Sequence, residues 1–293
     1  MKIIWQIAVK EFSDRFRSGW VIGCIAVWLA AVGLTSFFGS VQIGRLGFQG
    51  YDRTVLSLLN LVQYLIPLLG LLIGHDLVAG EREDGTLGLL LAGGVRRWRL
   101  LLGKFLGGWA TLALPLVLGF AMAGGAIATS NHSAGLNSFV VLAASGLALG
   151  TVFIAVGLLI SVSCRTRVKA LVFGLLVWGM AVFAYDLVAM GVLISTRAPA
   201  AAHEIEVLCD TTHLNNAEDL HNAFDAAGPV AKSSATQKNR LGAWLVLNPI
   251  DGFRMINLSA QFKFPGSLIG GVFLFWTTFA LIGSFCRLRR MDV

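Results

Sequence analysis

The sequence predicts an all-α integral membrane protein, a single transmembrane domain over residues 1–293. Apolar residues make up 56% of the 293 positions, and charged residues only 13%. Soluble domains carry about 25% charged residues to cover a surface that faces water, so a soluble enzyme is excluded. A spanning helix needs about 20 predominantly apolar residues. Six stretches meet this requirement: residues 20–38, 55–73, 105–127, 139–162, 170–194 and 266–285.

The basic residues predict that both termini are cytoplasmic, because lysine and arginine accumulate in cytoplasmic loops. Most of the 23 basic residues fall before the first span, in the second and fourth connections and in the tail. The formal net charge of +7 therefore reflects topology. No DNA-binding motif accompanies it, and nucleic acid is not expected as a partner.

Residues 1–19 are predicted to form an amphipathic helix on the cytoplasmic membrane surface. Its apolar stripe consists of Trp5, Val9, Phe12, Phe16 and Trp20. Charged residues such as Lys10 and Asp14 lie on another stripe. The segment is not expected to be a cleavable signal peptide, because its charged part is long and no small-residue cleavage site precedes the first span.

The connection over residues 74–104 is long, since helix connections in bundles usually take about 2–8 residues. Its first half carries four successive charged residues and then Gly85-Thr86, and its second half carries Arg96 and Arg97 beside Trp98. The apolar run from Leu87 to Leu91 is too short to span a bilayer. We expect a short surface helix that docks on a protein partner; the alternative is a solvated connection between two helices.

The sequence contains no complete phosphate-binding loop, zinc-protease helix or Gly-x-Ser-x-Gly motif. Gly103-Lys104 lacks both the first glycine and the final Ser or Thr of a phosphate-binding loop. His203-Glu204 is not followed by the second histidine of a zinc protease helix. No catalytic residue is therefore expected, and any ATP would be hydrolysed by another chain.

Asp186 is the one charged residue within a predicted span. A charge at mid-helix costs about 2.5–3.5 kcal/mol on insertion scales, so this carboxyl should face protein or water. Two interpretations stay open: a polar lock or substrate contact near the outer mouth, or a carboxyl that is hydrogen-bonded to a neighbouring helix.

The outer connection, residues 195–265, is the largest hydrophilic segment. Its weak candidates for a metal site are His203, Cys209, His213 and His221. Imidazole and thiolate suit copper or zinc, but the spacing matches no closed metal site. Docking of an outer partner is the favoured interpretation of this segment.

A helix on the outer membrane surface is predicted to begin at Asn248-Pro249. Asparagine is a common helix cap and proline fits the first turn. Asp251 and Arg254 are three residues apart and can pair on one face.

Four stretches carry a family resemblance: Ala8-Val9-Lys10-Glu11 through Arg17, Ile66-Pro67 through the connection with Gly80-Glu81-x-Glu83-x-Gly85-Thr86-Leu87, residues 183–186, and residues 247–258 with Asn248-Pro249-x-Asp251. With them the chain resembles the ABC-2 type permeases of ABC transporters. Within that family it is most similar to the permeases of nitrous-oxide-reductase maturation systems.

The resemblance implies a non-catalytic subunit in a bacterial inner membrane that binds no cofactor. It implies a coupling helix on a separate ATPase dimer, which binds ATP and Mg²⁺, a second copy of the chain, and a periplasmic repeat protein. The function implied is assembly of the copper sites of nitrous oxide reductase. The ATPase would contact Glu81, Arg82, Glu83, Asp84, Gly85, Thr86, Arg96 and Arg97. The periplasmic partner would contact Asn248, Pro249, Asp251 and Arg254.

Two alternatives from the sequence remain. One is an ABC-2 exporter of a lipid, drug or glycan, and the other is a membrane-embedded enzyme or channel. An exporter would need an open path between two protomers.

Overall fold

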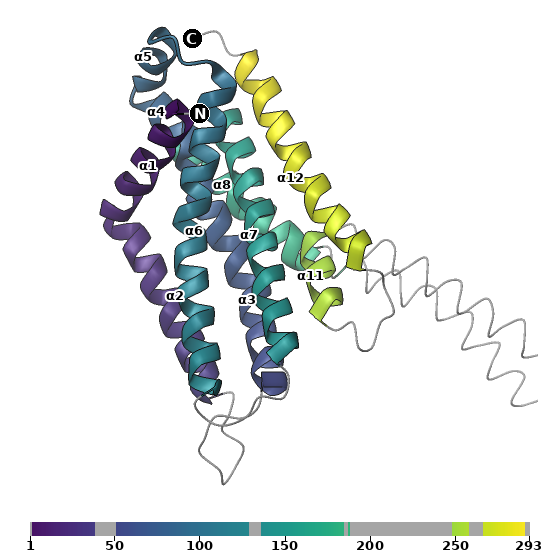
Figure 1. Ribbon diagram of the computed structural model, residues 1–293. Helices are drawn as coiled ribbons and strands as arrows, with labels where there is room; N and C mark the ends of the chain where they lie inside the picture. Colours follow the sequence, from purple (N-terminus) through teal and green to yellow (C-terminus); the bar gives the residue numbers. More distant parts are fainter. Residues whose placement is uncertain are drawn as a thin grey trace, which may run out of the picture.

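The computed structural model describes residues 2–38, 51–128, 136–184, 187, 248–257 and 266–290, and these residues form helices and no strands (Figure 1). In chain order the elements are α1 (Lys2–Arg17), α2 (Gly19–Phe38), α3 (Tyr51–Gly74), α4 (Asp76–Glu83), α5 (Thr86–Ala92), α6 (Arg97–Ala128), α7 (Leu136–Ser163), α8 (Arg167–Gly179) with a π-helical turn (Met180–Ala184), α11 (Pro249–Asn257) and α12 (Gly266–Arg289).

Five of the six predicted spans are confirmed as long apolar helices. Within the described residues, α2, α3, α6, α7 and α12 are long and apolar enough to cross a membrane. The span predicted at 170–194 begins as α8 and is described as far as Ala184, so its full length stays a prediction. Asp186, His203, Cys209, His213 and His221 lie outside the described residues.

The centre of the bundle is the pair α3 and α7, which approach each other through glycines. A Cβ added to Gly74 would lie 2.8 Å from the Cα of Gly157, and one added to Gly70 would lie 3.0 Å from the Cβ of Phe153. Since atoms do not pack that closely, larger residues at Gly74 would push the two helices apart. The small residues in these spans therefore serve packing within the chain.

Large apolar side chains remain exposed on the outer faces of the bundle. Examples are Val27 on α2, Leu176 on α8, and Leu274 and Phe275 on α12. A soluble protein rarely exposes so much contiguous apolar surface. These faces fit the hydrocarbon of a bilayer.

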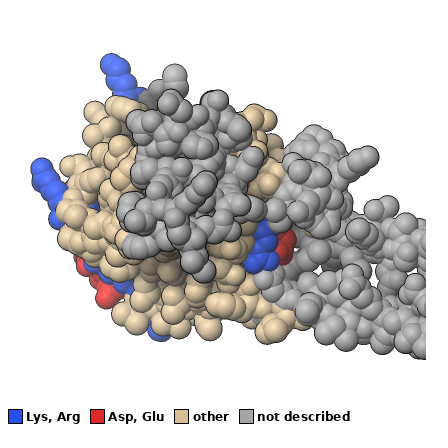
Figure 2. Space-filling view, turned by 90° about the horizontal axis from the view of Figure 1, so that it is seen from below, with Lys and Arg blue, Asp and Glu red and all other residues tan. Residues whose placement is uncertain are grey.

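The beginning of α1, the end of α12, α4 and α5 lie at one end of the bundle, called the terminal end below (Figure 1). Viewed from the opposite end, the described surface is largely uncharged, and its charged side chains lie near the rim (Figure 2). The predicted N-terminal helix is present as α1. It packs on α6 where Gly103 and Gly107 leave room for Ile7 and Ala8, and it leaves Trp5 71% exposed.

The helix predicted before the last span begins at Pro249, as expected, but it does not lie on the protein surface. Helix α11 packs against α3, α7 and α12. Six of its nine residues are buried, including Ile250 and Phe253. Its apolar side chains contact neighbouring helices, and Asp251 and Arg254 on its polar face pair with each other.

Candidate functional site

Helix α4 is the element around which polar side chains gather at the terminal end. It follows α3 after a single residue, His75, whose Nδ1 lies 2.6 Å from the carbonyl oxygen of Leu72. The middle of α4, from Leu77 to Gly80, is buried. The connection after α3 is therefore part of the packed structure and differs from a solvated loop.

Ser161 of α7 caps the first turn of α4. Its hydroxyl oxygen accepts hydrogen bonds from the backbone N–H groups of Val78 and Ala79, both at 2.9 Å. The first N–H groups of a helix lack partners within the helix, and α4 has no cap from its own N-cap residue His75. Sequence reasoning missed Ser161, because its only signal is a hydroxyl within an apolar span.

Lys104 of α6 joins α1 to α4. Its Nζ lies 2.8 Å from Glu81 Oε1 and also bonds Glu11 Oε1. The Lys104 side chain is 1% exposed, and these two carboxylates compensate for the loss of its contacts with water. Glu11 has a second cation nearby, since its Oε2 lies 3.6 Å from Arg15 Nε. Glu81 pairs with Lys104 in this structure, and its predicted contact with an ATPase stays a prediction.

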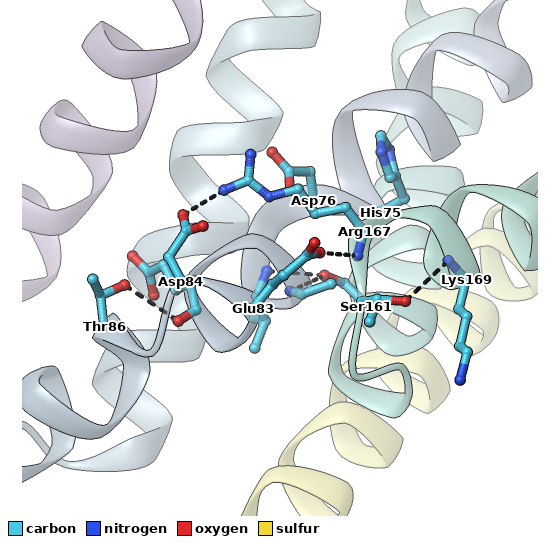
Figure 3. A network of polar contacts seen from close by, with 12 residues as sticks. His75, Asp76, Glu83, Asp84, Thr86, Ser161, Arg167 and Lys169 are labelled. Atoms are coloured by element: carbon cyan, nitrogen blue, oxygen red, sulfur yellow. Dashed lines mark hydrogen bonds and ion pairs between the residues drawn. The ribbon is translucent and has the colours of Figure 1, made fainter.

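Arg167 of α8 binds acidic side chains of α4 and of the turn that follows it (Figure 3). Its backbone N–H donates to Glu83 Oε2 at 2.7 Å. Its guanidinium pairs with Asp76 Oδ1 at 3.3 Å and with the carboxylate of Asp84. Gly80 makes room for this arrangement, since a Cβ there would lie 2.5 Å from Asp76 Oδ1. The acidic residues of the predicted docking segment thus bind their own chain, and Glu83 and Asp84 remain partly accessible.

The turn after α4 presents α5 to the outside. Gly85 has a φ of +72°, a left-handed conformation that glycine adopts without strain. The Thr86 hydroxyl donates to the carbonyl oxygen of Glu81 at 3.2 Å. Leu87 packs inward, whereas Leu89 is 74% exposed. A single short helix therefore offers an apolar side chain at the terminal end.

The remaining predicted residues of this segment lie near helix ends. Arg82 donates to the Cys164 carbonyl oxygen at 3.4 Å. Arg97 donates to the carbonyl oxygens of Leu288, at 3.0 Å, and Arg289, at 2.6 Å, at the end of α12. A cation there balances the negative end of the helix dipole. Arg96 is exposed.

A second polar cluster surrounds α11. The Asn248 side chain donates to Asp251 Oδ2 at 2.9 Å and to the carbonyl oxygen of Ala181 at 3.0 Å, and it accepts from the N–H of Ile250. Arg254 pairs with Asp251 Oδ1 at 2.9 Å and donates to Gln63 Oε1 of α3 at 2.6 Å.

These contacts bury the residues that were predicted to meet a periplasmic partner. Asn248, Pro249 and Asp251 are buried, and Arg254 is partly buried. Gln63 had not been singled out from the sequence, and neither had Ser145, whose Oγ accepts from Asn257 at 3.0 Å. Partner contact through these four residues stays a prediction. In this conformation they connect α11 to the bundle.

Within the residues that the structure describes, no group of three or more His, Cys, Asp or Glu side chains is placed to hold a metal ion. The predicted weak candidates His203, Cys209, His213 and His221 lie outside this part of the chain.

Comparison with known proteins shows which protein family this chain resembles. The family described as "ABC-2 family transporter protein" matches residues 5–293. A Pseudomonas aeruginosa protein named "Probable ABC transporter permease protein NosY" is 32% identical over 278 residues, which cover 93% of this chain and 86% of that protein. A Stutzerimonas stutzeri protein of the same name is 29% identical over 295 residues, covering 99% of each chain.

Proposed function

The chain belongs to the ABC-2 family of ABC transporter permeases, and we propose that a separate ATPase docks on it at α4 and α5 and drives its movements. In this proposal the terminal end is cytoplasmic. The ATPase binds and hydrolyses ATP with Mg²⁺, and this chain contributes no catalytic residue and binds no cofactor.

The observation that supports this proposal is the way α4 is fastened to the bundle. Lys104 connects α4 to α6 and α1, Ser161 connects it to α7, and Arg167 connects it to α8. A force applied to α4 or α5 therefore acts on four other helices at once. The exposed Leu89 supplies an apolar contact for the partner, and aromatic or aliphatic anchors of this kind are usual at protein interfaces.

The process proposed for the transporter is maturation of the copper sites of nitrous oxide reductase. This part rests on the two relatives named NosY and on their coverage of most of this chain. The complete assembly would contain two copies of the permease in a bacterial inner membrane, an ATPase dimer on the cytoplasmic side, and a periplasmic repeat protein on the outer side.

ATPase docking is tested by co-purification of the co-expressed ATPase with Leu89→Asp. A charge in the centre of the contact should reduce recovery of the ATPase at least tenfold. Val168→Asp is the matched control, since Val168 is similarly exposed but lies on α8. Equal recovery with both variants would contradict docking on α5. Charge reversal of Glu81 is a poorer test, because it also breaks the pair with Lys104.

The proposed process has its own test. In a strain that lacks this permease, nitrous oxide reductase should reach the periplasm with little copper, and the permease gene supplied in trans should restore the copper content. Full copper content in the deletion strain would reject the role in maturation and favour an unrelated exporter, while leaving the ATPase-docking result unaffected.

A further inference from the structure

The beginning of α6 meets the end of α12 at the terminal end, and arginines gather where the two helices meet. The guanidinium of Arg97 on α6 makes the contact, because it donates to the carbonyl oxygens of Leu288 and Arg289 at 3.0 and 2.6 Å. The surface called the arginine cluster below consists of Arg97, Arg99, Arg287, Arg289 and Arg290. The first two are partly exposed and the other three are exposed, so the cluster is accessible from outside the protein.

No carboxylate among the described residues pairs with the arginine cluster. Helices α6 and α12 contain no Asp or Glu, and neither does α7, which packs against both. The carboxylates of the terminal end lie on α1, on α4 and in the turn after α4, where four of them pair with Arg15, Lys104 and Arg167. The topology of the chain explains why arginines lie at this end. It does not explain why five of them lie together with no carboxylate beside them.

Trp98 indicates the depth of this surface in the membrane. Its side chain is 40% exposed, and Arg99 Cζ lies over the indole, 5.4 Å from the ring centroid, as a cation–π pair. Tryptophan and arginine side chains anchor spanning helices where the hydrocarbon ends and the lipid headgroups begin. The beginning of α6 therefore lies at the level of the headgroups.

Exposed apolar side chains lie about two helical turns deeper than the arginines. Leu106 follows Arg99 by seven residues and is 43% exposed, and Ile282 precedes Arg289 by seven residues and is 63% exposed. Residues seven apart lie on nearly the same face of a helix, about 10 Å apart along its axis. A molecule bound here meets cations at one end and apolar side chains beneath them, which suits an anionic phospholipid.

We propose that the arginine cluster binds the headgroup of an anionic phospholipid of the phosphatidylglycerol class. Guanidiniums donate to the phosphate oxygens in the paired geometry that arginine forms with phosphate, and the acyl chains contact Leu106 and Ile282. A phosphatidylethanolamine headgroup carries an ammonium beside its phosphate, and cations without a carboxylate repel this ammonium. An acidic protein segment would not need the exposed apolar side chains beneath the cluster. The site belongs to the permease alone and does not depend on docking of the ATPase.

The test uses the full-length permease, purified in a mild detergent with equal amounts of phosphatidylglycerol and phosphatidylethanolamine of identical acyl chains. Native mass spectrometry measures which lipid stays bound. We expect retention of phosphatidylglycerol about tenfold above phosphatidylethanolamine, a factor that two arginines near an anionic headgroup can supply. Equal retention of the two lipids would overturn the proposal.

A double variant assigns the retained lipid to this surface. Arg99→Gln/Arg289→Gln removes two charges and keeps the contact between α6 and α12, because Arg97 donates to backbone carbonyl oxygens. The preference for phosphatidylglycerol should fall to about twofold or less. Arg165→Gln/Lys169→Gln is the matched control, since it removes the same charge from two exposed side chains at the same end, and it should keep the full preference. An equal fall in both double variants would show attraction by net charge alone and overturn the proposal.

A second cluster variant leaves α6 unchanged. Arg287→Gln/Arg290→Gln alters only exposed side chains at the end of α12 and should lower the preference in the same way. A full preference for phosphatidylglycerol in both cluster variants would place the lipid elsewhere on the protein and overturn the proposal.

Two further arms separate other occupants of the arginine cluster. Soluble glycerophosphate at equal concentration should not displace phosphatidylglycerol, because it lacks acyl chains; displacement would identify a free phosphate compound as the ligand. The co-expressed ATPase should co-purify with Arg99→Gln/Arg289→Gln as well as with the unmodified permease. Loss of the ATPase from this variant, together with an unchanged lipid preference, would assign the cluster to a protein partner and overturn the lipid proposal.

Discussion

Replacement of Lys104 by methionine should destabilise the protein strongly. Methionine keeps most of the volume of the side chain and removes its charge. Glu11 and Glu81, whose side chains are only 12% and 19% exposed, then lose their shared cation. Glu11 keeps Arg15 at 3.6 Å, so the carboxylate left without a cation is that of Glu81.

The size of the effect follows from the burial of the pair. Removal of one partner from a buried ion pair typically costs about 3–5 kcal/mol. Coulomb's law gives a similar figure, since two unit charges 4 Å apart interact by about 4 kcal/mol at an effective dielectric constant of 20. Since only the Glu81 carboxylate is left without a cation, the free energy of unfolding should fall by about 3–5 kcal/mol, the cost of one broken pair.

The free energy of unfolding can be measured by titrating the purified protein from mild detergent into dodecyl sulfate. The double variant Lys104→Met/Glu81→Gln should recover a large part of the loss, because it removes the uncompensated charge. Lys169→Met is the control, as Lys169 is exposed at the same end. A Lys104→Met variant that unfolds like Lys169→Met, or a double variant no more stable than the single one, would refute this role of the ion pair.

Four more predictions concern single residues of the structure. Ser161→Ala leaves two N–H groups of α4 without an acceptor and should lower the free energy of unfolding by about 1–2 kcal/mol in the same titration. An unchanged free energy of unfolding would show that this cap does not stabilise the protein. Gly74→Ala should destabilise the α3–α7 contact, whereas Gly270→Ala, with nothing within 4 Å of the added Cβ, should be neutral; equal stability of the two variants would contradict the packing. In single-cysteine variants, the exposed Cys286 should react rapidly with a membrane-impermeant maleimide in inside-out vesicles only, and labelling from the outer side would reverse the proposed topology. Cys164 should react slowly at pH 7 and faster as the pH rises, because burial raises the pKa of its thiol and lowers the thiolate fraction.

The helices of this protein could be predicted from sequence because their signals are local. The apolar length of α2, α6 and α7 and the amphipathic stripe of α1 depend only on neighbouring residues. The beginning of α11 at Pro249 was predicted for the same reason, since caps and prolines act within one turn.

The partners of the polar residues could not be predicted, because they are distant in the chain. Arg254 bonds Gln63, which lies 191 residues earlier, and Glu81 bonds Lys104 on another helix. Because the sequence does not reveal these partners, the simplest prediction for a charged residue in a connection is that it is exposed to solvent. The sequence therefore indicated that the segment after α3 is polar, but it could not indicate that α4 is buried and bonded on several sides.

The contact between Gly74 and Gly157 also has a mechanical consequence. Two backbones touch there with no side chain between them, immediately before α4, so a displacement of the end of α3 acts directly on the backbone of α7. Gln63 lies 11 residues from Gly74, about 16 Å along α3 at 1.5 Å per residue. Over that length a tilt of α3 by about 5° corresponds to about 1.4 Å at Gln63, which is large beside its 2.6 Å bond to Arg254. The hydrogen bond between α3 and α11 is therefore the contact that such a tilt would strain.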